Sequence, residues 1–89
     1  MQFEWDRAKT LRNFRKHGVS FDEAVTVLYD SLSATFDDPD HSVAEAQLIT
    51  VGYSARGRLL VVAHTEGGAR TRIISARRAT ARERECHET

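Results

Sequence analysis

Three strand-like segments at hairpin spacing, all in the second half of the chain, restrict its fold more than any other feature. Aliphatic and β-branched residues dominate these segments, which cover residues 47–54, 58–66 and 70–77. The two connections between them are only a few residues long, which forces each strand to pair antiparallel with the next. The second half of the chain therefore predicts an antiparallel sheet.

The register of the last hairpin, whose turn contains Gly67 and Gly68, decides which side chains share a face. A two-residue loop pairs His64 with Thr71, and Arg77 then joins their face. A three-residue loop pairs His64 with Arg72 instead. A shift of one residue moves every side chain of a strand to the other face.

The first half of the chain predicts a short strand over residues 2–5 and two helices. The first helix is expected over residues 7–17, between an N-cap at Asp6 and a terminating Gly18. Its apolar stripe consists of Ala8, Leu11 and Phe14, with the basic side chains facing outward. The second helix begins at a capping box formed by Ser20 and Glu23 and is expected to end near residue 30.

A further strand over residues 33–37, a polar loop over residues 37–42 and a terminal helix complete the chain. The terminal helix begins at a capping box of Thr80 and Glu83. The predicted order is β-α-α-β-β-β-β-α, which is an α+β fold with an antiparallel sheet and helices packed on one face. With 89 residues, the chain is expected to form one domain, residues 1–89, with one modest core.

The net charge is zero, but the two halves of the chain differ. Residues 1–45 carry five basic and nine acidic side chains, whereas residues 46–89 carry eight arginines and four glutamates. The sums are 5 − 9 = −4 and 8 − 4 = +4. Because arginine suits phosphate, the late arginines are candidates for an anion-binding surface, with a merely solvated surface as the alternative.

Several classes of protein are disfavoured by what the sequence lacks. The single cysteine, Cys86, cannot form an internal disulfide, and Cys86-His87 does not have metal-ligand spacing, so neither a metal nor another cofactor is expected. No apolar run reaches the roughly 20 residues that span a bilayer, and the first residues do not resemble a signal peptide. We therefore expect a cytoplasmic protein without a membrane partner.

The remaining candidates for chemistry lie mostly on the last two strands. They are His64, Glu66, Arg70, Arg72, Arg77 and Arg78, with Lys16 and His17 at the end of the first helix. Such a set suits RNA cleavage by attack of the ribose 2′-hydroxyl on its own phosphate. That reaction needs an acid, a base and fixed positive charge, which imidazole, carboxylate and guanidinium groups supply.

Each candidate also has a purely structural interpretation. His64 ends an apolar strand and is equally consistent with a half-buried, hydrogen-bonded side chain. Glu66 is also placed to pair with Arg70 across the hairpin, and His17 suits a helix C-terminus, where a cation complements the dipole. A non-catalytic module that docks an acidic partner or a nucleic acid on its arginine face is therefore the alternative function.

Four segments in one order, residues 16–24, 38–42, 57–66 and 72–80, resemble the BrnT family. The motifs KHGVSF and RIISAR are the most specific. The resemblance implies a type II toxin with a RelE-like α+β fold and metal-independent endoribonuclease activity that arrests growth. It also implies a BrnA-like antitoxin of the ribbon-helix-helix type, and binding to promoter DNA only through the toxin-antitoxin complex.

The resemblance places site residues by position. His64, Glu66, Arg72 and Arg77 match as catalytic residues, and Lys16 falls in the first motif; we expect it to bind RNA with Arg70 and Arg78. Relatives often carry an aromatic residue in the last helix, where this chain has Cys86 and His87. The role of that helix is therefore open, as are the RNA sequence preference and the assignment of acid and base.

Overall fold

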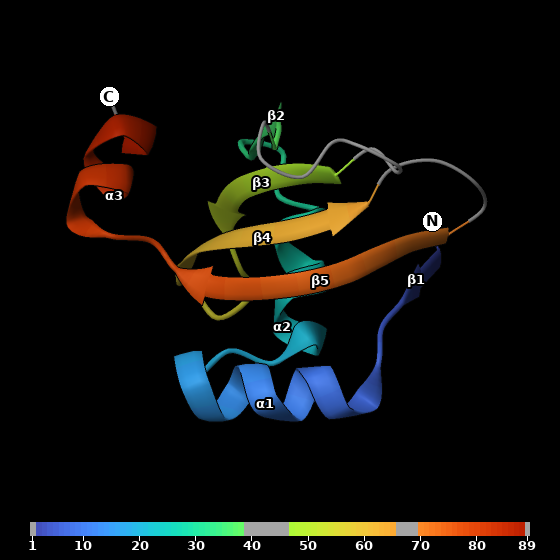
Figure 1. The fold of residues 1–89 in the computed structure, drawn as a ribbon. Coiled ribbons are helices and arrows are strands. Elements are labelled where there is room, and N and C mark those ends of the chain that lie inside the picture. The colour runs from blue at the N-terminus through green and yellow to red at the C-terminus, as the bar shows by residue number, and fades with distance from the viewer. Residues whose placement is uncertain (1, 39–46, 66–69, 89) are drawn as a thin grey trace.

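The computed structural model describes residues 2–38, 47–65 and 70–88, and its elements follow the predicted order (Figure 1). The elements are β1 (Gln2–Glu4), α1 (Arg7–His17), α2 (Phe21–Val27), β2 (Ala34–Asp37), β3 (Gln47–Tyr53), β4 (Leu59–Thr65), β5 (Arg70–Arg78) and α3 (Ala81–Glu88). The predicted α+β fold is thereby confirmed. The hairpin turn at Gly67-Gly68 and most of the predicted polar loop lie outside the described residues.

The five strands form one sheet in the order β1-β5-β4-β3-β2. The pairs β2–β3, β3–β4 and β4–β5 are antiparallel, as predicted. Strand β1, in contrast, pairs in parallel with β5. The pairing with β1 extends only from Arg70 to Arg72. Beyond Arg72, the outer edge of β5 has no strand beside it in the described part of the chain, and α1 packs there instead.

Both registers predicted for the last hairpin are wrong. His64 pairs with Ile73, and Ala63 pairs with Ser75, so Ile74 is an extra residue on β5. This β-bulge shifts the register by one residue along the strand, which sequence spacing does not reveal. As a result, His64 is opposite neither Thr71 nor Arg72.

Helices α1 and α2 lie on one side of the sheet, as predicted, whereas α3 lies on the other side, so the expectation that all helices pack on one face is wrong (Figure 1). The main core is between α2 and the sheet, where Phe21, Ala24 and Val27 pack against Leu60, Val62, Ile73 and Ala76. A smaller cluster on the opposite face contains Val51, Leu59 and Val61. The side chain of His64 is on the α2 side, since it is two and four residues from Val62 and Leu60.

Helix α1 has the predicted caps, but the side that it buries against the sheet is not the predicted one. Asp6 accepts hydrogen bonds from the amides of the first turn, and Gly18 ends the helix at φ 71°. However, Leu11 and Phe14 are 56% and 54% exposed, so the predicted inward apolar stripe is wrong. The only buried residue of the helix is Asn13.

The reason for this orientation is the free edge of β5, whose backbone groups need polar partners. The Asn13 side-chain amide donates to the carbonyls of Val19 and Ala76 at 2.8 and 2.7 Å. Its oxygen accepts from the Ala76 amide at 3.2 Å. One buried asparagine thus extends the hydrogen bonding of the strand edge into α1, a task that no apolar side chain can perform.

Candidate active site

A cleft of about 340 Å³ lies between α1 and the free edge of β5. It exists because β1 is too short to cover that edge and because the bulge brings Ile74 to the helix. The lining residues are Lys9, Arg12, Asn13, Lys16, His17, Ile74 and Ser75. Three permanent cations, one imidazole and a hydroxyl therefore face one opening, without an acidic residue.

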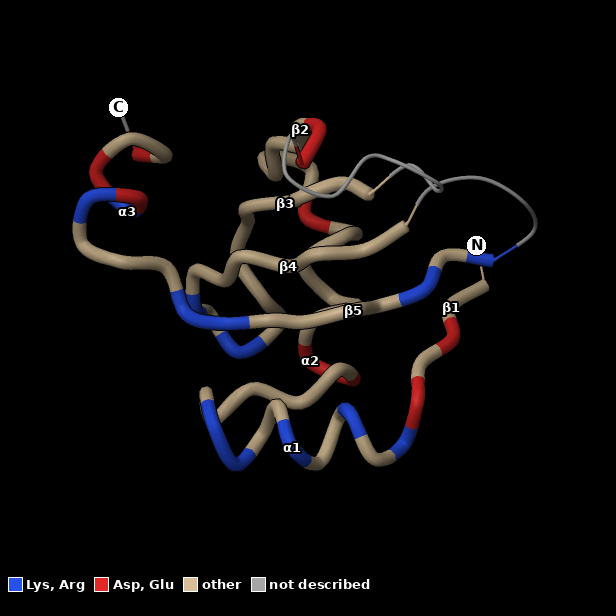
Figure 2. Tube along the Cα trace, viewed as in Figure 1, with Lys and Arg blue, Asp and Glu red and all other residues tan. Residues whose placement is uncertain are grey.

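The cations of α1 are not neutralised by the rest of the described structure. Helix α1 contains five basic residues and no acidic one. Among the described residues, no carboxylate forms an ion pair with any of these five side chains. Figure 2 shows basic positions recurring along the whole length of α1 with no acidic position among them. Lys9 shares a small cavity with Glu4 and Asp6 but forms no ion pair with either, so the positive charge of this helix is largely uncompensated.

Three of the four arginines of β5, in contrast, have acidic partners. Glu4 on β1 lies 3.7 Å from Arg70 and 3.6 Å from Arg72. Arg72 also lines a small cavity that includes both Glu4 and Asp6. Arg77 forms two hydrogen bonds with Glu83 of α3, at 2.7 and 2.8 Å. These guanidinium groups lie beside carboxylates of the same chain, whereas the prediction placed the phosphate of a ligand beside them.

The pairing of Arg77 with Glu83 also fixes the start of α3. Glu83 accepts from the Thr80 amide at 2.8 Å, and its own amide donates to the Thr80 hydroxyl at 3.2 Å, which confirms the predicted capping box. The hydrogen bonds from Arg77 are the main reason that the pKa of Glu83 falls to about 2. Glu83 is therefore an anion at physiological pH.

His64 is buried, with 7% of its surface exposed, on the side of the sheet that α2 covers. Its Nε2 is 2.7 Å from the Thr50 hydroxyl, which is 2.8 Å from the hydroxyl of Thr35. Its Nδ1 lies 3.1 Å from the carbonyl of Thr65 and must be the donor there, because a carbonyl only accepts. His64 and its hydroxyl partners line a cavity of about 290 Å³ whose described lining contains no Lys or Arg.

The sequence-predicted site residues are thus dispersed. Arg77 pairs with Val61 in the register, so it lies on the face opposite to His64. Arg72 neighbours the buried Ile73 on β5 and points to the other face from it. Arg78, opposite Leu60, lies on the α1 side at the end of β5. Glu66 lies outside the described residues.

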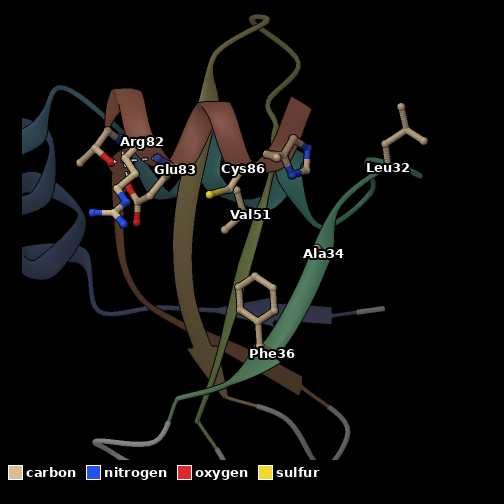
Figure 3. Close-up of a pocket in the computed structure, with 9 residues that line it drawn as sticks. Leu32, Ala34, Phe36, Val51, Arg82, Glu83 and Cys86 are labelled. Carbon is tan, nitrogen blue, oxygen red and sulfur yellow. Dashed lines mark hydrogen bonds between the residues drawn. The ribbon is translucent and has the colours of Figure 1, made fainter. Parts of the chain in front are cut away.

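A cavity of about 640 Å³ forms a mostly apolar groove between α3 and β2 (Figure 3). Phe36 and Val51 of the sheet and Cys86 of α3 point into it. His87 lies edge-on to Tyr53 with ring centroids 5.9 Å apart. With one arginine and one glutamate in its lining, this groove lacks the cationic surplus of the α1 cleft.

The described part of the chain lacks two further features. No three His, Cys, Asp or Glu side chains gather in a group that could hold a metal ion there. None of the helices in the same ranges is both long enough and apolar enough to cross a membrane.

Sequence reasoning missed Lys9, Arg12 and Ser75 as lining residues of the cleft. Lys9 and Arg12 were expected to be ordinary solvated positions of α1. A signal was present in the sequence, because five basic residues without one acid in eleven positions is an unusual charge pattern for a helix. Ser75 had no comparable signal, since its position depends on the bulge.

The mixed sheet, the helix against its free edge and the cationic cleft define a small α+β protein equipped to bind a polyanion. A family model described as "Ribonuclease toxin, BrnT, of type II toxin-antitoxin system" matches residues 5–83. The chain belongs to this family. An antitoxin partner is part of the family's definition.

The fold agrees with this assignment. The crystal structure of the Brucella abortus ribonuclease toxin BrnT matches with a TM-score of 0.70 and 24% sequence identity. The match covers 90% of this chain and 97% of the Brucella chain. No curated protein sequence matches this chain significantly.

Proposed function

We propose that this chain is a metal-independent endoribonuclease toxin that binds and cleaves RNA in the cleft between α1 and β5. The observation that carries the proposal is the set of unpaired cations, Lys9, Arg12 and Lys16, at one opening beside His17. A ribose-phosphate chain is the polyanion that the family description supplies. The proposal departs from the predicted catalytic site, because the two arginines expected there, Arg72 and Arg77, lie beside Glu4 and Glu83.

The chemistry assigns a role to each group in the cleft. The 2′-oxygen attacks the adjacent phosphorus, the bond from phosphorus to the 5′-oxygen breaks, and a 2′,3′-cyclic phosphate forms. His17 exchanges a proton with one of the two reacting oxygens, since imidazole donates and accepts protons near neutral pH. Water exchanges the other proton, so that the 2′-hydroxyl loses one proton and the 5′-oxygen gains one. Lys9, Arg12 and Lys16 stabilise the charge that accumulates on the phosphate oxygens.

The catalytic roles predicted for His64, Glu66, Arg72 and Arg77 remain a competing proposal. They need the Nε2 atom of His64 to exchange its Thr50 partner for RNA. They also need Arg77 to leave Glu83. Since both exchanges break hydrogen bonds that the described structure already satisfies, the α1 cleft is the more economical site.

The biological setting follows from the family. We propose that the toxin acts in the cytoplasm and arrests growth by cutting RNA. A BrnA-like antitoxin with a ribbon-helix-helix part neutralises it, and the complex of the two binds promoter DNA. Growth arrest on expression of this chain alone, relieved by the antitoxin, is the expected cellular result.

The direct test uses a single-stranded RNA oligonucleotide and its 2′-deoxy analogue, each incubated with the purified protein in excess chelator. We expect cleavage of the RNA to fragments ending in a cyclic phosphate and no cleavage of the analogue, because only RNA carries the internal nucleophile. A strict need for added metal would contradict the mechanism. Salt-sensitive binding without cleavage would favour the alternative, a binding module.

A further inference from the structure

Helix α1 has a second outer surface that the cleft does not use. Arg7, Leu11, Phe14 and Arg15 are all exposed, and they are three or four residues apart. Residues at this spacing are neighbours on a helix surface. We call these four residues the α1 flank. It places two large apolar side chains between two guanidinium groups.

The α1 flank and the cleft lie on different sides of the same helix. Asn13 marks the side that faces β5, and Lys9, Arg12 and Lys16 follow it in one direction around the helix axis. Successive residues are about 100° apart at 3.6 residues per turn, so Phe14, Arg7 and Leu11 follow in the other direction. One helix therefore presents a purely cationic surface and a mixed apolar and cationic surface.

We propose that the α1 flank is a docking surface for an acidic amphipathic helix of the antitoxin. This inference names the chemistry of the partner that the family implies, and it does not require catalysis in the cleft. Leu11 and Phe14 would pack against an apolar stripe of the partner helix. Arg7 and Arg15 would pair with Asp or Glu residues beside that stripe.

Charge complementarity selects this occupant over the alternatives. A second copy of the chain would bring another α1 with five cations and no acid against the first, which is a repulsive contact. RNA would satisfy the two arginines but gives no reason for two apolar side chains to be more than half exposed between them. An acidic amphipathic helix satisfies both components, and helix-in-groove recognition uses apolar anchors at this spacing.

The position of the flank also suggests how docking affects RNA. A helix laid along α1 brings carboxylates within about one helix diameter, roughly 10 Å, of the cleft. That distance is close to the screening length at physiological salt. Docking would therefore lower the positive potential at the cleft and weaken RNA binding without filling the cleft.

The experiment uses the full chain and a labelled synthetic peptide of about 20 residues, long enough to form a stable helix with a leucine stripe flanked by glutamates. Binding is measured by fluorescence anisotropy at physiological salt. Two control peptides replace either the leucines with serine or the glutamates with lysine. We expect only the acidic amphipathic peptide to bind tightly, because each control removes one of the two components.

Variants of the chain locate the binding. Leu11→Gln with Phe14→Gln should weaken peptide binding about 30-fold, since two partly exposed apolar side chains lose their burial. Lys9→Gln with Lys16→Gln removes two charges from the other side and should weaken it less than threefold. The Leu11/Phe14 variant should keep its cleavage of the RNA oligonucleotide, because neither side chain lines the cleft.

Two kinds of outcome would overturn the inference. Equal peptide binding by the wild type and the Leu11/Phe14 variant would show that the flank is not the docking surface. Loss of RNA cleavage in that variant would assign the flank to RNA. Self-association of the wild type that is lost in that variant would assign the flank to a second copy of the chain. Failure of the wild type to cut RNA would overturn the proposed function alone, since peptide binding is measured separately.

Discussion

The cations of α1 and the arginines of the second half of the chain have the same charge but different surroundings. None of the five basic residues of α1 has an acidic partner among the described residues. Six of the eight later arginines lie at ion-pair distance from a carboxylate, namely Arg56, Arg58, Arg70, Arg72, Arg77 and Arg84. These six arginines share four carboxylates, those of Glu4, Glu23, Glu83 and Glu88, so the half of the chain with the positive sum is the half whose cations are mostly paired.

The comparison shows that folding brings carboxylates from the first half of the chain beside arginines of the second half. Two acids from the first half, Glu4 and Glu23, serve four of the later arginines. Glu23 is buried, and its pKa is lowered mainly by a hydrogen bond from Arg58. Its carboxylate also accepts from the Ser54 hydroxyl at 2.7 Å. Such a pair stabilises the fold and is unavailable to a ligand.

The largest effect expected is on cleavage in the α1 cleft. His17→Ala should lower the rate of RNA cleavage about 1,000-fold, since a positioned acid or base contributes roughly 10²- to 10⁴-fold. The measurement is the single-turnover rate with an RNA oligonucleotide. His64→Gln is the matched control and should keep most of the activity. The reverse result, with His64 essential and His17 dispensable, would return the active site to the β4–β5 hairpin.

The next effect concerns the attachment of α1 to the free edge of β5. Asn13→Ala leaves the backbone groups of Ala76 and the Val19 carbonyl without their partner, which should cost about 3 kcal/mol of stability. Urea denaturation measures the loss. Arg12→Ala, one residue away and exposed, should change stability by less than about 0.5 kcal/mol. Equal stability of the two variants would show that Asn13 does not hold the helix.

Much of the fold was predictable because local signals and the final structure agree. The caps at Asp6, Gly18 and Ser20 lie where the sequence pattern places them. The antiparallel strands follow from their hairpin spacing. In these segments, the backbone's own hydrogen-bonding needs are satisfied by nearby residues, so a sequence window contains the relevant information.

The site was less predictable because it depends on contacts between distant segments. The hydrogen bonds of Asn13 with Ala76 join residues that are 63 positions apart in the sequence. They turn the Asn13 side of α1 toward the sheet in place of the predicted apolar side. The bulge at Ile74 changes which side chains share a face. Neither Glu4 beside Arg72 nor Glu83 beside Arg77 could be weighed before the strand partners and α3 were in place. Counting charges along the chain could not anticipate these pairings.

A smaller effect should distinguish the two sets of cations by the salt dependence of RNA binding. Lys16→Ala should reduce the slope of log K against log salt by about 0.7, as expected for one lost contact with a single strand. Arg72→Ala should reduce the slope less than Lys16→Ala, because Arg72 shares the carboxylate of Glu4 with Arg70. Binding isotherms at four salt concentrations measure both slopes. An equal reduction by Arg72→Ala would place RNA on β5 as well.

The smallest effect concerns the ion pair between Arg77 and Glu83. The pKa of Glu83 is lowered from 4.5 to about 2, chiefly by its hydrogen bonds with Arg77. A lowered pKa stabilises the folded state above the unfolded value of 4.5, and this contribution is lost as the pH falls through about 2. Because both side chains are partly exposed, we expect only about 1 kcal/mol.

The test compares the wild type with Glu83→Gln by urea denaturation between pH 6 and pH 2. The wild type should be more stable at pH 6, and the difference should shrink as Glu83 becomes protonated. A difference that does not change with pH would mean that the carboxylate's charge contributes nothing. The same variant releases Arg77 on the face opposite to His64. RNA cleavage should not change, because a cation released on that face lies outside the α1 cleft, and a marked gain would show that Glu83 had been blocking a phosphate site.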